Sequence, residues 1–345
     1  MPVSGAVPVA GAEWPEADGL FRDDRWRGSD DAYSIPLGGN RVLWLFGDTF
    51  VARPGEPTRV GSAFIRNSVA VQTGLDPLTA TMDFAWRGTD EAPEDYFPGD
   101  GLGSGAEWLW PGHGVWHEGR LLLFFMACDL PPGGDPHDPL GLSFRVTGWR
   151  AVTIDNPADP PADWQLVSVV ERPDTASAVL GAATLVDGDD VYLWAYRAGQ
   201  ALLARTDVRR AVAGDLGELQ WWAGGDSWVP GPSAAAVALD PAVTEFTVHR
   251  DDSGGLVLID VHPVTDASAA VCMRHAAGVT GPWSPRSPAY PIPEAGRTDA
   301  FVYAGKAHPE LAGGGLVVTY ASNGKELAPL YADESLYYPR FARLR

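Results

Sequence analysis

The sequence predicts an all-β protein, a five-bladed β-propeller with four-stranded blades whose last blade is closed by an N-terminal strand. The chain contains 40 glycines and 30 prolines, a composition typical of turn-rich all-β folds. An apolar hairpin also recurs five times, at intervals of roughly 60 to 80 residues, which is enough chain for one four-stranded blade. We therefore expect residues 1–345 to form a single propeller domain.

Each hairpin consists of two apolar runs joined by a tight turn rich in glycine, asparagine or aspartate, a pattern that favours antiparallel strands. The five hairpins span residues 29–50, 108–129, 178–197, 244–262 and 302–323. A third alternating strand follows each of them, and a tryptophan-bearing segment then ends the first four copies, around Trp86, Trp164, Trp221 and Trp283.

The fifth copy ends at the C-terminus without such a segment. We expect Leu20–Trp26 to supply the missing strand by pairing with Leu336–Leu344. Residues 1–19, rich in proline, alanine and glycine, are expected to form an irregular N-terminal arm.

Charge and motifs exclude several classes of function. The formal charge of −20 argues against nucleic acid or an anionic membrane surface as a partner. No apolar run is long enough to span a membrane, and no secretion signal precedes the first strand, so we predict a cytoplasmic protein. The motifs of serine hydrolases, zinc proteases, dithiol enzymes and P-loop NTPases are missing.

The two cysteines, Cys128 and Cys272, lie far apart in apolar runs. Buried reduced thiols are the expected state, with a disulfide as the alternative.

A candidate site follows from the topology, because the start of each inner strand and the end of its neighbour meet on one face of a propeller. We expect Asp31, Glu245 and Asp48 there as catalytic residues. Further residues expected to contact substrate are Asp30, Arg66, Asn67, Trp110, His113, Asp260, His308, Tyr320 and Asn323. The rim would also carry Tyr196, Arg197 and Lys306, and the loops 91–107 and 130–145 would form walls or lids.

No metal site is predicted from the histidines, because His113 and His117 would be about 13 Å apart along a strand. A calcium ion held by the central carboxylates remains an alternative.

Several motifs resemble those of the five-bladed propeller glycosidases, the superfamily of arabinanases, β-xylosidases and levanases. Within it, the chain is most similar to bacterial families of unknown function related to endo-D-arabinanases, glycoside hydrolase family 183. The matching motifs are Asp-x-Ala-Tyr-Ser-Ile-Pro-Leu at 30–37, Leu-Trp-Leu-Phe-Gly-Asp-Thr-Phe at 43–50, Arg-Asn-Ser at 66–68, Trp-Pro-Gly-His-Gly at 110–114, Glu-Phe-Thr-Val at 245–248, Ala-His-Pro-Glu-Leu at 307–311 and Leu-Tyr-Tyr-Pro-Arg-Phe at 336–341.

The resemblance implies a general base at Asp31 or Asp30 and a general acid at Glu245. The aspartate that opens blade three in the superfamily is replaced here by Leu180–Gly181–Ala182, so Asp48 or Asp260 would have to take its role.

From the residues themselves, Phe246 beside Glu245 favours a raised pKa and the role of acid. Asp31 would then be base or nucleophile, with Asp48 as its electrostatic partner.

These features predict a glycoside hydrolase for a furanoside or small glycoside, with a small molecule or oligosaccharide as its partner. Two alternatives remain: an intracellular cyclase, lyase or isomerase that uses the same funnel, and a sugar-binding propeller without catalysis. The sequence indicates no oligomeric state.

Overall fold

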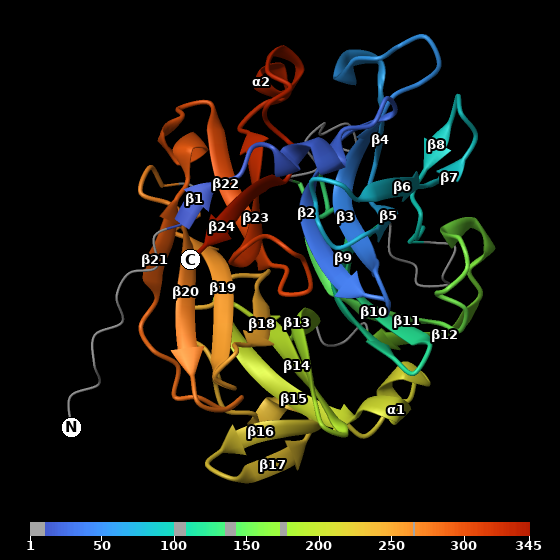
Figure 1. The fold of residues 1–345 in the computed structure, drawn as a ribbon. Coiled ribbons are helices and arrows are strands. Elements are labelled where there is room, and N and C mark those ends of the chain that lie inside the picture. Colours follow the sequence, from blue (N-terminus) through green and yellow to red (C-terminus); the bar gives the residue numbers. More distant parts are fainter. Residues whose placement is uncertain (1–10, 100–107, 135–142, 173–177, 265) are drawn as a thin grey trace.

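In the computed structural model, which describes residues 11–99, 108–134, 143–172, 178–264 and 266–345, five antiparallel sheets surround a central axis (Figure 1). The inner strand of blade one, β2, contacts β9 and β22, the inner strands of blades two and five. β13 and β18, from blades three and four, complete the ring between β9 and β22. These five inner strands are β2 (Trp26–Pro36), β9 (Trp108–His117), β13 (Val179–Asp187), β18 (Thr247–Arg250) and β22 (Ala300–Ala307). The predicted five-bladed propeller is thus confirmed.

Each blade extends outward from its inner strand. Blade one adds β3 (Arg41–Val51), β5 (Ser68–Thr73) and β6 (Thr81–Ala85), with β4 (Ala63–Ile65) beside β3. Blade two adds β10 (Arg120–Asp129), β11 (Arg145–Ile154) and β12 (Leu166–Arg172). Blade three adds β14 (Asp190–Arg197), β15 (Gln200–Asp207), β16 (Gln220–Gly224) and β17 (Ser227–Pro230), one strand more than predicted. Blade four adds β19 (Leu256–His262), β20 (Ala270–Ala276) and β21 (Ser287–Pro291).

Blade five closes the ring with an N-terminal strand, but not with the predicted one. It contains β22, β23 (Leu316–Gly324), β24 (Arg340–Leu344) and β1 (Gly11–Glu13). β1 pairs with β24 through Gly11 opposite Leu344. The expected strand Leu20–Trp26 is wrong, because Ala17–Phe21 forms the 3-10 helix η1 and Trp26 already begins β2. The expected arm 1–19 therefore contains the closing strand, and its residues 1–10 lie outside the described part.

The remaining elements are short. They are the two-stranded sheet of β7 (Arg87–Gly88) and β8 (Pro93–Glu94), the helices α1 (Val208–Val212) and α2 (Leu327–Ala332), and the 3-10 helices η2 (Arg59–Gly61), η4 (Pro161–Asp163), η5 (Pro232–Ala234) and η6 (Pro293–Gly296). Across the described ranges, no helix is both long and apolar enough to cross a bilayer.

Apolar side chains pack between neighbouring blades and form the core. One cluster joins blades one and two through Leu45, Leu109 and Phe125, and another joins blades three and four through Trp194 and Phe246. Cys128 in β10 and Cys272 in β20 are buried free thiols. Because the blades contact one another along this core, the inner strands are held rigidly around the axis.

Four of the five inner strands break their pairing register near the same level of the channel. On β2 the shift lies between Asp31 and Tyr33, and on β9 it lies opposite the segment Leu123 to Phe125 of β10. On β13 it lies between Leu180 and Ala183, and on β22 between Tyr303 and Lys306. Such bulges re-aim side chains and are common near functional sites. Asp31 has a φ of 66°, an uncommon conformation for a residue other than glycine.

Candidate active site

Four carboxyl side chains line one cavity of about 580 Å³ at the start of the inner strands. They are Asp30, Asp31 and Asp48 of blade one and Glu245, which lies two residues before β18 of blade four. We call this the carboxylate cavity. A volume of this order encloses one small ligand. The topology therefore brings the three predicted catalytic residues to one cavity.

Lys306 lies between two of these carboxyl groups. Its Nζ is 2.7 Å from Oδ1 of Asp31 and 2.8 Å from Oε2 of Glu245, and its side chain is completely buried. The ammonium also lies 4.1 Å from the centre of the Tyr33 ring, within the range of a cation–π contact. One buried cation thus holds carboxyl groups from two different blades together.

This arrangement separates the pKa values of the two carboxyl groups. Burial raises the pKa of Asp31 well above its usual range, against the attraction of Lys306. The pKa of Glu245 is lowered, since the charge of Lys306 and a hydrogen bond with Asp31 outweigh the cost of burial. Asp31 is the more buried of the two, with 8 % of its side chain exposed against 26 % for Glu245, so it keeps the proton. The expected raised pKa of Glu245 is therefore wrong.

Asp48 is held by a cation and an indole. Arg66 contacts its Oδ2 at 3.1 Å, and the Nε1 of Trp110 donates to its Oδ1 at 2.7 Å. Burial nevertheless raises the pKa of Asp48 to about 7. This carboxyl group can therefore take up or release a proton near neutral pH.

Asp30 belongs to a chain of hydrogen bonds from blade five. Tyr303 donates its hydroxyl to Oδ2 of Asp30 at 2.6 Å, and Asn323 donates to the Tyr303 oxygen at 3.3 Å. Burial, with the nearby charge of Asp48, raises the pKa of Asp30 well above its usual range. The Oδ1 of Asn323 is buried without a partner in the structure, and a ligand hydroxyl that donates to it would satisfy this oxygen.

Three other predicted binding residues lie outside the cavity. Their polar atoms form hydrogen bonds or ion pairs with neighbouring protein groups. Asn67 donates to the carbonyls of Phe97 and Leu109, 2.9 Å away in each case, and so joins blade one to blade two. Asp260 forms a buried ion pair with Arg286 at 2.7 Å. Tyr320 donates to Glu294 at 2.9 Å.

The two predicted histidines lie further along the inner strands. His308 is fully buried, with Nδ1 2.6 Å from the Ser34 hydroxyl and Nε2 2.8 Å from that of Thr319. His113 stacks on Tyr33, with ring centres 5.2 Å apart, and its Nδ1 is 3.1 Å from the amide of Thr184. Both are therefore placed as packing and hydrogen-bonding residues rather than as contacts of the carboxylate cavity.

His113 faces a second cavity of about 460 Å³ at the other end of the inner strands, which also contains His249, Ser34 and Glu310. We call it the histidine cavity. Burial lowers the pKa values of both His113 and His249 to about 4, and raises that of Glu310. The two histidines are therefore neutral at neutral pH.

Sequence reasoning placed Lys306 at the rim without a role, and it missed Tyr33 and Tyr303. The signal for Lys306 was present: the chain has only two lysines, and this one interrupts an apolar strand. A charged residue there requires a partner. The predicted rim residues Tyr196 and Arg197 do line the cavity. The central parts of the expected lid loops, 100–107 and 135–142, lie outside the described residues.

In the described ranges, no group of three or more histidine, cysteine, aspartate or glutamate side chains is arranged to hold a metal ion. Where a calcium ion would have to bridge Asp31 and Glu245, the ammonium of Lys306 is present instead.

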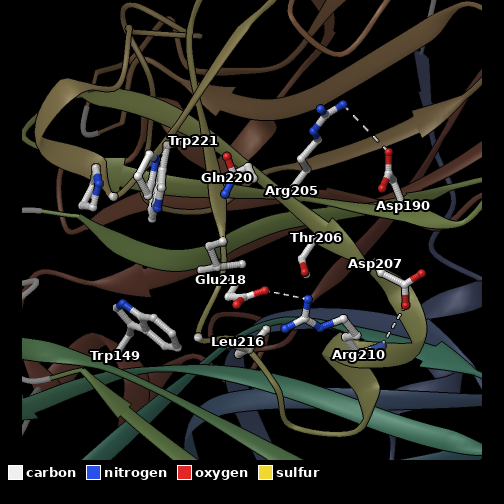
Figure 2. A pocket seen from close by; sticks show the side chains of 15 residues that line it. Trp149, Asp190, Arg205, Thr206, Asp207, Arg210, Leu216, Glu218, Gln220 and Trp221 are labelled. Carbon is white, nitrogen blue, oxygen red and sulfur yellow. Dashed lines mark hydrogen bonds and ion pairs between the residues drawn. The ribbon is translucent and has the colours of Figure 1, made fainter.

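Another open cavity, of about 830 Å³, lies on the outer part of blade three (Figure 2). Its charged side chains pair with one another: Arg210 contacts Glu218 at 2.8 Å, and Arg205 lies 3.9 Å from Asp190. Asp207 accepts from the backbone amide of Arg210 and caps α1. These charged side chains are therefore already paired with one another at the partly exposed surface.

A family model matches residues 18–345. The chain belongs to the family described as a domain of unknown function, DUF5005. No curated protein matches the sequence. A solved structure of a candidate hydrolase from Bacteroides ovatus resembles this DUF5005 chain with a TM-score of 0.72 and 20% sequence identity, over 95% of this chain and 88% of that one. This likeness shows the shared propeller fold.

Two further solved structures have TM-scores below 0.5. An endo-arabinase from Bacteroides thetaiotaomicron has a TM-score of 0.47 at 12% identity and covers 92% of this chain and 94% of its own. An α-L-arabinofuranosidase from Podospora anserina, solved with cellotriose, has a TM-score of 0.48 at 12% identity, over 98% and 95% of the two chains.

Proposed function

We propose that the protein is a glycoside hydrolase that cleaves a small furanoside in the carboxylate cavity. The observation that carries this proposal is the pair Asp31 and Glu245, two carboxyl groups on one ammonium whose pKa values move in opposite directions. Glycosidases need one protonated and one ionised carboxyl group at the scissile bond. The fold shared with a candidate hydrolase of Bacteroides ovatus agrees with this function, although fold alone does not assign a reaction.

The proposed roles are the reverse of those expected from the sequence. Asp31 carries the proton and donates it to the leaving oxygen as the glycosidic C–O bond breaks. Ionised Glu245 forms a bond to the anomeric carbon. Water then attacks this carbon and releases Glu245, while the carboxylate of Asp31 takes up the proton of the water, which restores both groups. Lys306 stabilises the charge that alternates between the two carboxyl groups.

The separation of these groups favours retention of configuration. The two oxygens lie 2.7 and 2.8 Å from one nitrogen, so they are at most about 5.5 Å apart, which is shorter than the roughly 6.5–9.5 Å typical of inverting enzymes. Asp48, Asp30 and the unpaired oxygen of Asn323 would bind the sugar hydroxyls. Retention is thus the stereochemical outcome that we propose.

The test is hydrolysis of a panel of 4-nitrophenyl glycosides that contains the α and β anomers of L- and D-arabinofuranose and D-galactofuranose. We expect release of nitrophenol from at least one furanoside, and proton NMR should show that the first product keeps the anomeric configuration. Asp31→Asn should lower kcat by about 10³-fold or more while the unfolding midpoint stays near that of the parent. No release from any furanoside would overturn the proposal.

A further inference from the structure

The carboxylate cavity has two unlike halves. Blades one, four and five line it with the carboxyl groups, Tyr303 and Asn323, beside the rings of Tyr33 and Phe301. Blades two and three contribute a wall of apolar and aromatic side chains: Trp110, Met126, Phe144, Val179, Leu180 and Tyr196. We call these six residues the apolar wall. The polar and apolar halves come from opposite sides of the ring, so one bound molecule would contact both.

The apolar wall begins directly at the carboxyl groups. Trp110 donates its indole N–H to Asp48, and its ring contacts Phe144 edge to face with centres 4.7 Å apart. Phe144 is 39% exposed, and Met126 and Val179 are half-buried. Apolar side chains left partly open beside a polar site are typical of ligand-binding surfaces. A group joined to the sugar would meet this wall first.

The wall offers little to a second sugar. Sugar hydroxyls are bound by carboxylate, amide and hydroxyl groups, and of these side-chain groups the described lining of blades two and three supplies only the Tyr196 hydroxyl, beside the guanidinium of Arg197. At the place where β13 opens, Leu180 and Ala182 line the cavity with apolar side chains. An apolar group, in contrast, would be buried favourably there, because it has no polar atoms that would lose hydrogen bonds to water.

We propose that the natural substrate is a glycoside with an apolar aglycone of about one aromatic ring, which packs against the apolar wall while the sugar lies over the carboxyl groups. This inference rests on the proposed function for the identity of the polar half. The volume of about 580 Å³ suits one small two-part molecule, because pockets of a few hundred Å³ enclose drug-sized ligands.

The experiment compares methyl and benzyl glycosides in matched pairs, built on α-L-arabinofuranose, β-D-galactofuranose and β-D-xylopyranose. Because the sugar is the same within a pair, the ratio of the two affinities isolates the aglycone. Calorimetric binding to Glu245→Gln, which should not turn over the probes, is expected to be roughly tenfold tighter for the benzyl member of at least one pair.

Met126→Gln keeps the size of the side chain but places an amide in the wall, and should reduce this ratio several-fold. Met82→Gln, on β6 outside the cavity, is the matched control and should leave the ratio unchanged. Equal affinities within every pair, or an equal effect of both variants, would overturn the inference. Hydrolysis without an aglycone preference would refute the wall and keep the proposed function. A preference for the benzyl member that depends on Met126, without any hydrolysis by the parent, would keep the wall and refute the proposed function.

Discussion

The carboxylate cavity and the histidine cavity lie at opposite ends of the same five inner strands. In the first, four carboxyl groups lie together, two of them on one buried lysine, and Asp31 has a strained backbone. In the second, burial keeps His113 and His249 neutral, and the backbone amide of Thr184 lies 3.1 Å from Nδ1 of His113.

The difference shows that the two ends of the same propeller channel can have different roles, reactivity at one end and stability at the other. Charge is concentrated where a ligand can enter, and strain is located at the same level. At the other end, neutral imidazole rings line the cavity, and His113 joins blade two to blade three through the amide of Thr184. We therefore expect substitutions in the carboxylate cavity to change activity and those in the histidine cavity to change stability alone.

The largest effect on stability is expected at Lys306, because this buried cation lies in the carboxylate cavity and also joins two blades. Lys306→Met would leave Asp31 and Glu245 buried without their cation, and such losses cost about 3–5 kcal/mol of unfolding free energy. Protonation of Glu245 would remove this uncompensated buried charge, so the loss should be smaller at pH 5 than at pH 8. Urea unfolding at both pH values measures it.

Lys325→Met is the control for this prediction, because Lys325 is exposed and contacts only the carbonyl of Thr298 at 3.0 Å among the hydrogen bonds described. It should change the free energy of unfolding by less than about 0.5 kcal/mol. Similar losses for both lysines would contradict the buried bridge.

Asp48 should give the parent protein a stability that falls as pH rises. Its pKa is about 7 in the folded protein, above the value of 3.8 for an unperturbed aspartate, so the folded state binds the proton more tightly between these limits. Each unit of pKa shift corresponds to about 1.4 kcal/mol, so the total decrease from pH 4 to pH 7 amounts to a few kcal/mol. Asp48→Asn should flatten this part of the unfolding profile, and an unchanged profile would contradict the shift.

His113 should act in the opposite direction. Its pKa falls from 6.5 to about 4 on folding, so its contribution is fully present above pH 6.5 and is lost as pH falls toward 4. The loss is at most about 3 kcal/mol by the same conversion. His113→Gln should reduce the acid sensitivity of unfolding without changing kcat. A matching loss of activity would instead place His113 in the reaction.

The comparison also shows what could be predicted from the sequence. The recurrent hairpins indicated the ring, because each turn and its alternating strands are local signals. Asp30, Asp31, Asp48, Trp110, Glu245 and Asn323 do meet in one cavity. Ring closure was assigned to the wrong residues, since the three-residue strand Gly11–Glu13 carries almost no pattern of its own.

The errors at the site have a different origin. His113 lies only one position beyond Gly112, which lines the carboxylate cavity, yet it faces the other end of the channel. Bulges decide this orientation, and the sequence pattern does not locate them. The order of the pKa values of Asp31 and Glu245 depends on Lys306, which comes from a third blade. Lys306 lies 61 or more positions from either carboxyl group in the sequence, so no local pattern indicates these contacts.

The most direct test uses the two glutamates, one in each cavity. Glu245→Gln and Glu310→Gln make the same chemical change at opposite ends of the channel, and hydrolysis of the furanoside that the parent cleaves best is the measurement. We expect Glu245→Gln to lower kcat by about 10³-fold or more and Glu310→Gln to stay within about twofold of the parent, as is usual for a residue outside the reaction. Near-parental activity of Glu245→Gln, or an equal loss in both variants, would contradict the assignment of the reaction to the carboxylate cavity.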